Sequence, residues 1–339
     1  MDELRGKARK PFVSIVITFY DAEDTVDYCL SSVLNQSYEP YEVICIDDGS
    51  RDCTLDKIKK YAANERVKFF TKENGGPAAA RNFGAEKASG EYISFIDGDD
   101  CISPYYLEAL VNAMIELPCD FVVGKMRVMN FSDIGNCEWC KPASGENTLI
   151  DQREYLERLL YDEIPLSTCA RLAPRKLYVD NPAKIGMGYE DVDMAARYVS
   201  HLNAIGVVDC HVYGYVMRED SVVHRKKAQY KQVLDYLTAM GDFSGDVEEF
   251  FPKTSSQQVF FHALHYSRIY RLLCVVSDAE HLVTEEKQKI RSYLKQSNNL
   301  IRKDARVSRG NKIRFCLLTY VPMVYNCLFT MYERIKKGV

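Results

Sequence analysis

The chain has 339 residues, enough for one large domain and a smaller one. A hydrophobic fraction of 47%, a charged fraction of 27% and a net charge of -4 are ordinary for a globular protein and exclude the basic character of a nucleic-acid-binding domain. The chain has twelve cysteines, and its N-terminus does not resemble a signal peptide. We therefore expect free thiols in a reducing, cytoplasmic compartment.

The first elements alternate between strand and helix. Residues 1–10 are charged and predict a flexible tail. Val13–Thr18 is a β-branched, apolar run typical of a central parallel strand. A helix is predicted next, which Asp21 or Asp24 is placed to cap. Its apolar positions are Val26, Cys29, Leu30, Val33 and Leu34.

The same alternation continues to residue 101. We predict strands at 41–46, 67–70 and 92–96 and helices at 55–62 and 77–87. The second helix has Pro77 in its first turn and Gly90 after its end. This order predicts an α/β domain with a parallel sheet and right-handed crossovers.

Polar residues follow three of these strands. The strand ends are Phe19-Tyr20-Asp21, Asp47-Asp48 and Asp97-Gly98-Asp99-Asp100. Ligands of open α/β sheets bind outside the carboxyl ends of the strands, so three polar ends on one edge predict a site. Two carboxylates about 4 Å apart repel by about 4 kcal/mol, which a divalent cation bound to phosphate would offset. An acidic turn that points into solvent is the alternative.

Longer segments around these turns resemble a known family. Two of them are similar to the nucleotide-sugar-binding half of family 2 glycosyltransferases, which have the GT-A fold: SIVITFYDAEDTVDYCLSSVLNQSYEPYEVICIDDGSRDCT and NGGPAAARNFGAEKASGEYISFIDGDD. Gly188-Tyr189-Glu190-Asp191 resembles the ED motif of that family, and YGYVMREDS (213–221) its Tyr-x-Tyr-x-x-Arg…Ser segment. The resemblance covers residues 11–225, weakens across 126–171 and stops before the last hundred residues.

The resemblance implies a UDP-sugar donor. Asp48 would accept a hydrogen bond from the uracil ring. The base would be framed by the backbone from Thr18 to Tyr20 together with Asp21 or Glu23. From the residues alone, Asp48 could instead cap the helix that follows.

Three basic residues are candidates to bind the nucleotide sugar. Lys72 and Arg81 flank the Gly75-Gly76-Pro77 turn, and the family places Arg81 against the phosphates at the start of a helix. Arg218 is the third, in a segment that folds over the diphosphate in GT-A enzymes. The alternative for all three is an ordinary solvated side chain.

Asp97 and Asp99 are implied to form the DxD motif that works with Mn²⁺ or Mg²⁺. Asp99 would bind the metal directly, Asp97 would contact the ribose or a metal-bound water, and Asp100 would orient the sugar. His224, after Ser221, is a further candidate ligand. Such an ion bridges the two phosphates and neutralises the departing nucleoside diphosphate.

Asp191 is implied to be the general base for the acceptor hydroxyl. With an ordinary pKa near 3.9 it would be a weak base that takes the proton only as the attack proceeds. From the residues alone, Glu190-Asp191 is an acidic N-cap and first turn of a helix over 192–199.

The C-terminal third is predicted to be helical, from apolar spacing at 230–237 and 259–276. We therefore expect a catalytic domain at 11–225, with a nucleotide-sugar half (11–101) and an acceptor half (102–225), and a helical region at 226–339. Residues 315–332 carry no charge, and Pro322 is expected to interrupt any helix there. Residues 312–337 would pack against the domain or a dimer mate, or lie in a membrane interface. A polar stripe argues against spanning: Lys312, Thr319, Asn326, Thr330 and Glu333.

The segment between the two motif blocks carries fewer signals. Cys137 and Cys140 form one CxxC with no second pair to complete a zinc site. Trp139 between them is expected to pack in a core, although an exposed ring could stack on a sugar.

The sequence therefore predicts an inverting, metal-dependent glycosyltransferase of surface polysaccharide synthesis, at the inner face of the plasma membrane. It would move a sugar from a UDP-sugar to a hydroxyl of a glycan or lipid-linked acceptor. A sugar nucleotidyltransferase is an alternative, but it would carry a Gly-rich basic loop where Phe19-Tyr20-Asp21-Ala22 stands. A non-catalytic nucleotide-sugar-binding protein on the same fold is the other.

Overall fold

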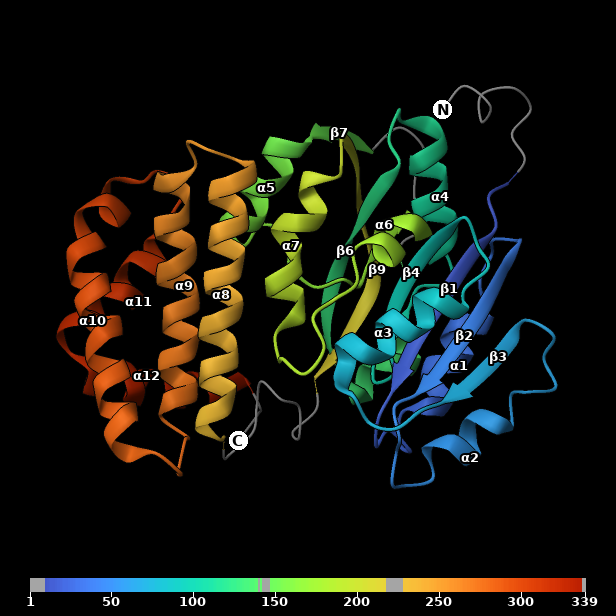
Figure 1. Ribbon diagram of the computed structural model, residues 1–339, viewed down its shortest axis with the longest axis horizontal. Helices are drawn as coiled ribbons and strands as arrows, with labels where there is room; N and C mark the ends of the chain where they lie inside the picture. The colour runs from blue at the N-terminus through green and yellow to red at the C-terminus, as the bar shows by residue number, and fades with distance from the viewer. Residues whose placement is uncertain (1–9, 140, 142–146, 218–227, 337–339) are drawn as a thin grey trace. The chain divides into compact units, whose positions relative to one another are not determined.

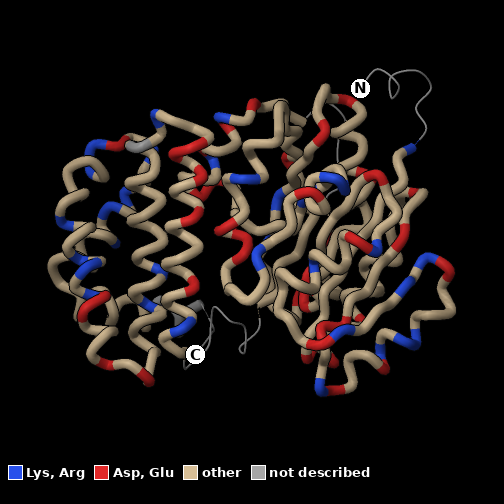
Figure 2. The backbone as a smooth tube through the Cα atoms, in the orientation of Figure 1, with Lys and Arg blue, Asp and Glu red and all other residues tan. Residues whose placement is uncertain are grey.

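The structure is a computed structural model that describes residues 10–139, 141, 147–217 and 228–336. It divides into two compact units, residues 1–155 with 166–224, and residues 156–165 with 225–339. Figure 1 shows a sheet with helices in the first unit and a group of helices in the second. Lys, Arg, Asp and Glu are interspersed along both units (Figure 2), in keeping with the small net charge.

The first unit is built on one mixed sheet, which has nine strands among the described residues, in the order β3-β2-β1-β4-β8-β6-β9-β5 with β7 beside β9. The first four strands are parallel, as predicted, while β8 is antiparallel to both β4 and β6. The strands are β1 Val13–Phe19, β2 Tyr41–Asp47, β3 Val67–Thr71, β4 Tyr92–Asp97, β5 Cys101–Ile102, β6 Phe121–Asn130, β7 Thr148–Asp151, β8 Arg171–Pro174 and β9 Ala204–Met217.

Helices cover this sheet and connect its strands (Figure 1). They are α1 Val26–Leu34, α2 Thr54–Lys59, α3 Gly76–Lys87, α4 Tyr106–Glu116, the 3-10 helix η2 Phe131–Asn136, α5 Gln152–Leu160, α6 Arg175–Asp180 and α7 Glu190–Ser200. Helix α3 packs especially close to the sheet. A Cβ added at Gly84 would lie 2.3 Å from Cγ1 of Val16, so only glycine permits this approach without a shift. That packing fixes where α3 begins relative to the ends of β1 and β2.

The predicted cap of α1 by Asp21 or Asp24 is wrong. The N-cap residue is Thr25, whose hydroxyl donates to the carbonyls of Ala22 at 3.0 Å and Gly98 at 2.7 Å. The Asp21 carboxylate instead accepts from the backbone N–H of Arg51 at 2.8 Å. Thr25 therefore stabilises the turn after β4 rather than the start of α1, because its hydroxyl donates to the carbonyl of Gly98.

Strand β9 is longer than the predicted range of 211–216. It begins at Ala204 and pairs with β6, with register shifts around Lys125. Asp209 and Cys210 lie at this irregularity, where Asp209 forms an ion pair with Lys125. A β-bulge therefore accommodates the polar residues that interrupt the apolar pattern in the sequence.

The second unit is helical, as predicted for the C-terminal region. Its helices are α8 Tyr230–Phe250, α9 Ser255–Leu273, α10 Glu280–Lys303, α11 Arg309–Tyr320 and α12 Pro322–Lys336. The chain leaves its helix at Val321, so Pro322 interrupts the helix as expected. Phe243 and Phe261 stack in the core with ring centroids 4.4 Å apart. No helix in the described part of the chain is long and apolar enough to cross a membrane.

Residues 156–165 belong to the helical unit through specific contacts. The Tyr161 hydroxyl donates to Oδ2 of Asp304 at 2.6 Å, and the Arg306 guanidinium lies 4.1 Å from the centroid of the Tyr161 ring. Arg306 also pairs with Glu157 at 3.0 Å and Glu163 at 2.9 Å. The second half of α5 is thus held by the start of the α10–α11 connection.

The cysteines that the structure describes are free thiols, as predicted. Cys140 of the CxxC pair lies outside the described residues. Trp139 is partly buried and packs against a small cluster of Cys101, Met129 and Val216, so it contributes to a core.

Candidate active site

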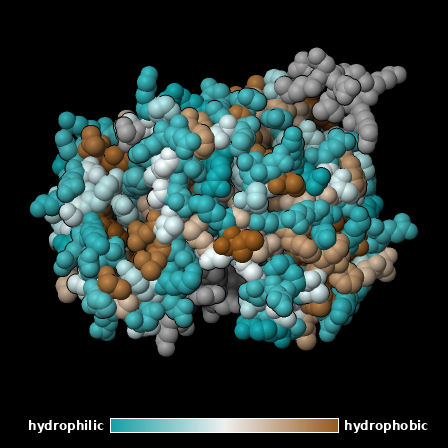
Figure 3. All heavy atoms as spheres, in the orientation of Figure 1, coloured by the Kyte–Doolittle hydropathy of each residue, from teal (hydrophilic) through white to brown (hydrophobic). Residues whose placement is uncertain are grey.

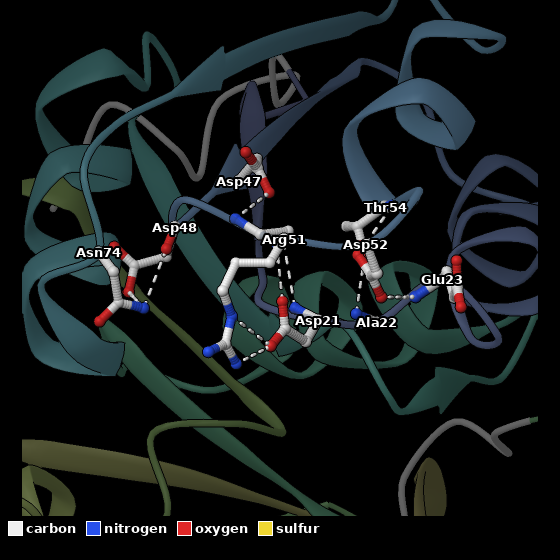
Figure 4. A network of polar contacts seen from close by, with 10 residues as sticks. Asp21, Ala22, Glu23, Asp47, Asp48, Arg51, Asp52, Thr54 and Asn74 are labelled. Atoms are coloured by element: carbon white, nitrogen blue, oxygen red, sulfur yellow. Dashed lines mark hydrogen bonds and ion pairs between the residues drawn. The ribbon is translucent and has the colours of Figure 1, made fainter.

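Asp48, at the end of β2, anchors the loop before α3. The buried carboxylate accepts hydrogen bonds from the backbone N–H groups of Gly75 at 3.1 Å and Gly76 at 2.8 Å, and from Nζ of Lys72 at 2.7 Å. The side-chain amide of Asn74 donates to it at 3.3 Å, and Figure 4 shows these two residues facing each other. Asp48 does not cap α2, whose N-cap residue is Cys53. The carboxylate thus joins the ends of β2 and β3.

The loop after β1 is bound to the loop after β2, as Figure 4 shows. The backbone N–H of Ala22 donates to Oγ1 of Thr54 at 2.7 Å, and that of Glu23 donates to Oδ2 of Asp52 at 3.0 Å. Oε2 of Glu23 accepts from the N–H of Cys53 at 3.1 Å. Glu23 therefore holds its neighbouring loop, while the Tyr20 ring beside it is 43% exposed.

Arg51 fixes the end of this loop through Asp21. Its Nε donates to Oδ2 of Asp21 at 3.2 Å, and these hydrogen bonds hold the pKa of the Asp21 carboxyl below its ordinary value. Asp21 has a φ of 45°, which its side-chain and backbone contacts maintain.

The Asp97-Gly98-Asp99-Asp100 turn after β4 is held by β1 and α1. The N–H of Gly98 donates to the carbonyl of Thr18 at 2.9 Å, and the Tyr28 hydroxyl donates to the carbonyl of Asp99. A Cβ at Gly98 would lie 2.2 Å from Cδ1 of Phe19, so the turn needs glycine at this position. The geometry leaves the side chains of Asp97 and Asp99 half-buried at the sheet edge.

Asp100 points the other way, into the protein. It is 1% exposed, and its carboxylate accepts from the Tyr213 hydroxyl at 2.6 Å and the Val216 N–H at 2.8 Å. Burial, followed by the charges of Asp99 and Asp97, raises the pKa of this carboxyl well above its ordinary value. The expectation that Asp100 orients the sugar finds no support in this geometry, because both oxygens bind β9.

Arg81 links the turn after β4 to the start of α7. Its Nη2 lies 2.7 Å from Oδ1 of Asp97, and its Nη1 pairs with Oε1 of Glu190. The side chains of Arg81 and Glu190 are only 12% and 9% exposed. Two residues far apart in the sequence, Asp97 and Glu190, are therefore held beside each other by one guanidinium.

Asp191 follows Glu190 in the first turn of α7. The N-cap residue of α7 is Tyr189, which directly precedes Glu190. It has a φ of 63°, a left-handed conformation that costs free energy in a bulky residue. The half-buried Asp191 carboxylate accepts from the N–H of Val192 at 2.9 Å. Burial and then the neighbouring Glu190 charge raise the pKa of Asp191 to about 6. A carboxylate with this pKa is a stronger base than the ordinary Asp that the sequence predicts.

The donor set at the turn fits a hard divalent ion only in part. Among the described residues, no group of three or more His, Cys, Asp or Glu side chains could hold a metal by itself. Asp97 is engaged with Arg81, while the half-buried Asp99 carboxylate is of the chemistry that Mg²⁺ and Mn²⁺ prefer. An ion here would be bound through one or two carboxylates together with phosphate oxygens.

The structure brings most of the predicted residues to one edge of the sheet. Asp48 and Lys72 form one group there, and Asp97, Arg81 and Glu190 form another. Arg218, Ser221 and His224 lie outside the described residues. The contact of Glu190 with Arg81 was not predicted from the sequence. A buried arginine in the Ala-rich helix α3 requires acidic partners, and that requirement was the available signal.

A parallel sheet with acidic turns at its carboxyl edge, joined to an antiparallel extension, is the arrangement that defines the GT-A class of folds. The chain is similar to a crystal structure of residues 1–349 of S. aureus TarS in complex with UDP-GlcNAc. The TM-score is 0.55 at 20% sequence identity, over 83% of this chain and 89% of that chain. This similarity shows the fold, and the predicted GT-A fold is confirmed.

The family follows from the sequence comparisons. Residues 14–178 match the model of glycosyl transferase family 2. An uncharacterized glycosyltransferase of Haemophilus influenzae is 47% identical over 108 residues, which are 31% of this chain and 43% of that protein. The poly(ribitol-phosphate) beta-glucosyltransferase of Bacillus spizizenii is 41% identical over 123 residues, 35% of this chain and 19% of that protein. The aligned part is thus less than half the length of these curated relatives. Through residues 14–178 the chain belongs to glycosyl transferase family 2.

Proposed function

We propose that this glycosyltransferase moves a sugar from a UDP-sugar to a hydroxyl group of a glycan or lipid-linked acceptor, with inversion at the anomeric carbon. The name of the Bacillus spizizenii relative supports a role in surface polysaccharide synthesis. The bound UDP-GlcNAc in the similar S. aureus structure supports a uridine nucleotide donor.

One observation carries the proposal, the bridge that Arg81 makes between Asp97 and Glu190. It holds the start of α7, and with it Asp191, beside the acidic turn after β4. A single displacement needs the base and the leaving group on opposite sides of the reacting carbon, held by fixed side chains. We assign Asp191 to the base and the edge around Asp48 to the nucleotide.

Asp191 suits the role of base because of its surroundings. With a pKa near 6 it is ionised at neutral pH, yet it binds a proton more tightly than an ordinary aspartate. It accepts the acceptor proton as the new glycosidic bond forms and UDP leaves. Inversion follows, because a single in-line attack exchanges the two faces of the anomeric carbon.

Residues Asp99 and Asp97 would hold Mn²⁺ or Mg²⁺, the first directly and the second through water. The ion supplies neutralisation of charge on the departing diphosphate. Arg81 and Lys72 add positive charge near the same edge, although each is already paired with a carboxylate. We further assign Arg218 to binding of the phosphates and His224 to binding of the metal.

UDP release tests the proposal. The full chain is incubated with a panel of UDP-sugars, with Mn²⁺ or with EDTA, and UDP is measured with and without candidate acceptors. We expect release for one donor class, loss of release in EDTA and its absence in Asp191→Asn. Binding of a UDP-sugar with no release under any condition would favour a non-catalytic binding protein. Formation of UDP-sugar from UTP and sugar phosphate would favour the nucleotidyltransferase.

Three further features belong to the same proposal. They are a cytoplasmic location at the inner face of the plasma membrane, a homodimer, and a peripheral membrane contact through residues 312–337. The free cysteines among the described residues support a reducing compartment. The surface of α11 and α12 supports the membrane contact.

A further inference from the structure

The outer face of α11 and α12 is apolar. On α12 the exposed residues include Met323, Val324, Leu328 and Met331, of which Met323 is 86% exposed. With the exposed Cys327 they fall at spacings of one and three residues, which places them on one side of the helix. On α11, Ile313, Cys316 and Tyr320 form a similar stripe. We call this set the outer face.

The opposite side of the two helices is the one that packs in the helical unit. Phe315, Leu318 and Tyr325 are 3%, 0% and 4% exposed. The corner between the helices is also apolar and exposed, at Tyr320 and Val321. The outer face therefore continues from one helix to the next as exposed apolar surface that takes no part in packing the core. On the face in Figure 3, by contrast, apolar residues lie in small groups among hydrophilic ones.

The charges in residues 305–332, the segment that carries the outer face, have one sign. Between residues 305 and 332 the sequence contains no Asp or Glu, while Arg309 and Lys312 lie at the start of α11. Arg309 is exposed and falls on the same stripe as Ile313. Arg302 and Lys303 are exposed at the end of α10, immediately before this segment. An apolar strip with basic residues at one end is the pattern of helices that lie in a membrane interface.

We propose that the outer face binds the surface of an anionic lipid bilayer, with the apolar side chains among the acyl chains and Arg309 and Lys312 at the headgroups. A second copy of this chain fits less well. In a two-fold contact through the outer face, residues 305–332 of neither copy offer an acid to pair with Arg309 and Lys312 of the other. The proposal deepens the membrane contact named above and rests on no step of catalysis.

Flotation of the purified full chain with vesicles tests this directly. We expect binding to vesicles of phosphatidylcholine with phosphatidylglycerol, little binding to pure phosphatidylcholine, and weaker binding in 1 M NaCl, where the Debye length falls to about 3 Å. M323E/L328E should lose binding at least tenfold. R309Q/K312Q should lose about tenfold, since each basic residue near an anionic surface contributes severalfold.

Leu234→Glu is the matched control, because Leu234 is an apolar residue of α8, 47% exposed, in the same unit. It should bind vesicles as the unchanged chain does, and thermal melts should show that all variants fold. Equal flotation of M323E/L328E and the unchanged chain would overturn the proposal. Absence of flotation of the unchanged chain would also overturn the proposal. In that case, a dimer in solution that M323E/L328E dissociates would identify the outer face as a contact between copies. UDP release in solution is measured separately, so a failed membrane contact leaves the proposed activity standing.

Discussion

At the scale of single residues, the base that we assign is set apart by its environment. Asp191 lies in the first turn of α7, where a helix N-terminus by itself would lower the pKa of a carboxylate. Burial and the adjacent Glu190 outweigh that effect and raise its pKa to about 6. The negative charge of Glu190 thus has two effects: it pairs with Arg81, and it raises the pKa of Asp191.

The first prediction concerns the pH dependence of catalysis. Since the base must be ionised, kcat/KM should fall about tenfold per unit of pH below an apparent pKa of about 6. Asp191→Asn should lower transfer by about 10²- to 10⁴-fold while UDP-sugar binding changes little. Initial rates from pH 5 to 8 and calorimetric donor binding provide the measurement. Asp180→Asn, an exposed position on α6, is the control, and substantial transfer by Asp191→Asn would refute the assignment.

The second prediction separates the two uses of Glu190. Glu190→Gln keeps a hydrogen-bond acceptor for Arg81 but removes a charge that raises the pKa of Asp191. The acidic limb of kcat/KM should therefore move to lower pH, and stability should fall by about 1–3 kcal/mol as Arg81 loses one charged partner. Glu86→Gln, at an exposed position on α3, should change neither quantity. A loss of activity with an unmoved pH profile would limit Glu190 to a structural role.

At the scale of elements, strand–helix alternation predicted β1 to β4 and the helices between them to within a few residues. Continuous apolar runs mark buried parallel strands clearly, and Gly, Pro and Asp mark their ends. The caps of α1 and α2 were not predictable, because Thr25 and Asp48 make their bonds to residues far along the chain. The direction of the Asp100 side chain was hidden for the same reason, since it depends on β9.

The third prediction tests the contact of α3 with the sheet. Gly84→Ala should destabilise the first unit by about 1–3 kcal/mol, because the added methyl group overlaps Val16 and the helix must shift. Since α3 carries Arg81, UDP release should fall as well. Gly241→Ala is the matched control: nothing lies within 4 Å of its added Cβ, and alanine favours helix α8 by up to about 1 kcal/mol. Urea titration measures both, and equal effects would refute the packing argument.

At the scale of the whole molecule, the two units carry buried titratable groups whose pKa shifts have opposite consequences. In the helical unit, His265 is 2% exposed, its Nδ1 lies 2.9 Å from the Tyr236 hydroxyl, and burial lowers its pKa well below the ordinary value. Burial likewise lowers the pKa of His262, which lies 2.7 Å from Oγ of Ser244. In the first unit the pKa of Asp191 is raised.

The fourth prediction is that acidification separates the unfolding of the two units. An unfolded histidine binds a proton below a pH of about 6.5, while buried His265 does not, so the helical unit loses stability as the pH falls below that value. Asp191 has the opposite sign. Its folded form takes up a proton near pH 6 and its unfolded form only near 3.9, so its contribution to stability grows between these values.

The single tryptophan lets the two transitions be followed apart. Trp139 lies in the first unit, so its fluorescence reports that unit, while far-UV circular dichroism is dominated by helices, of which α8 to α12 form the second. When the pH is lowered from 7.5 to 5.5, the thermal unfolding midpoint measured by circular dichroism should fall by several degrees relative to the midpoint measured by fluorescence. His265→Gln retains a partner for Tyr236 without a titrating ring, so it should reduce this separation. Midpoints that move together in both proteins would show that the two units unfold as one.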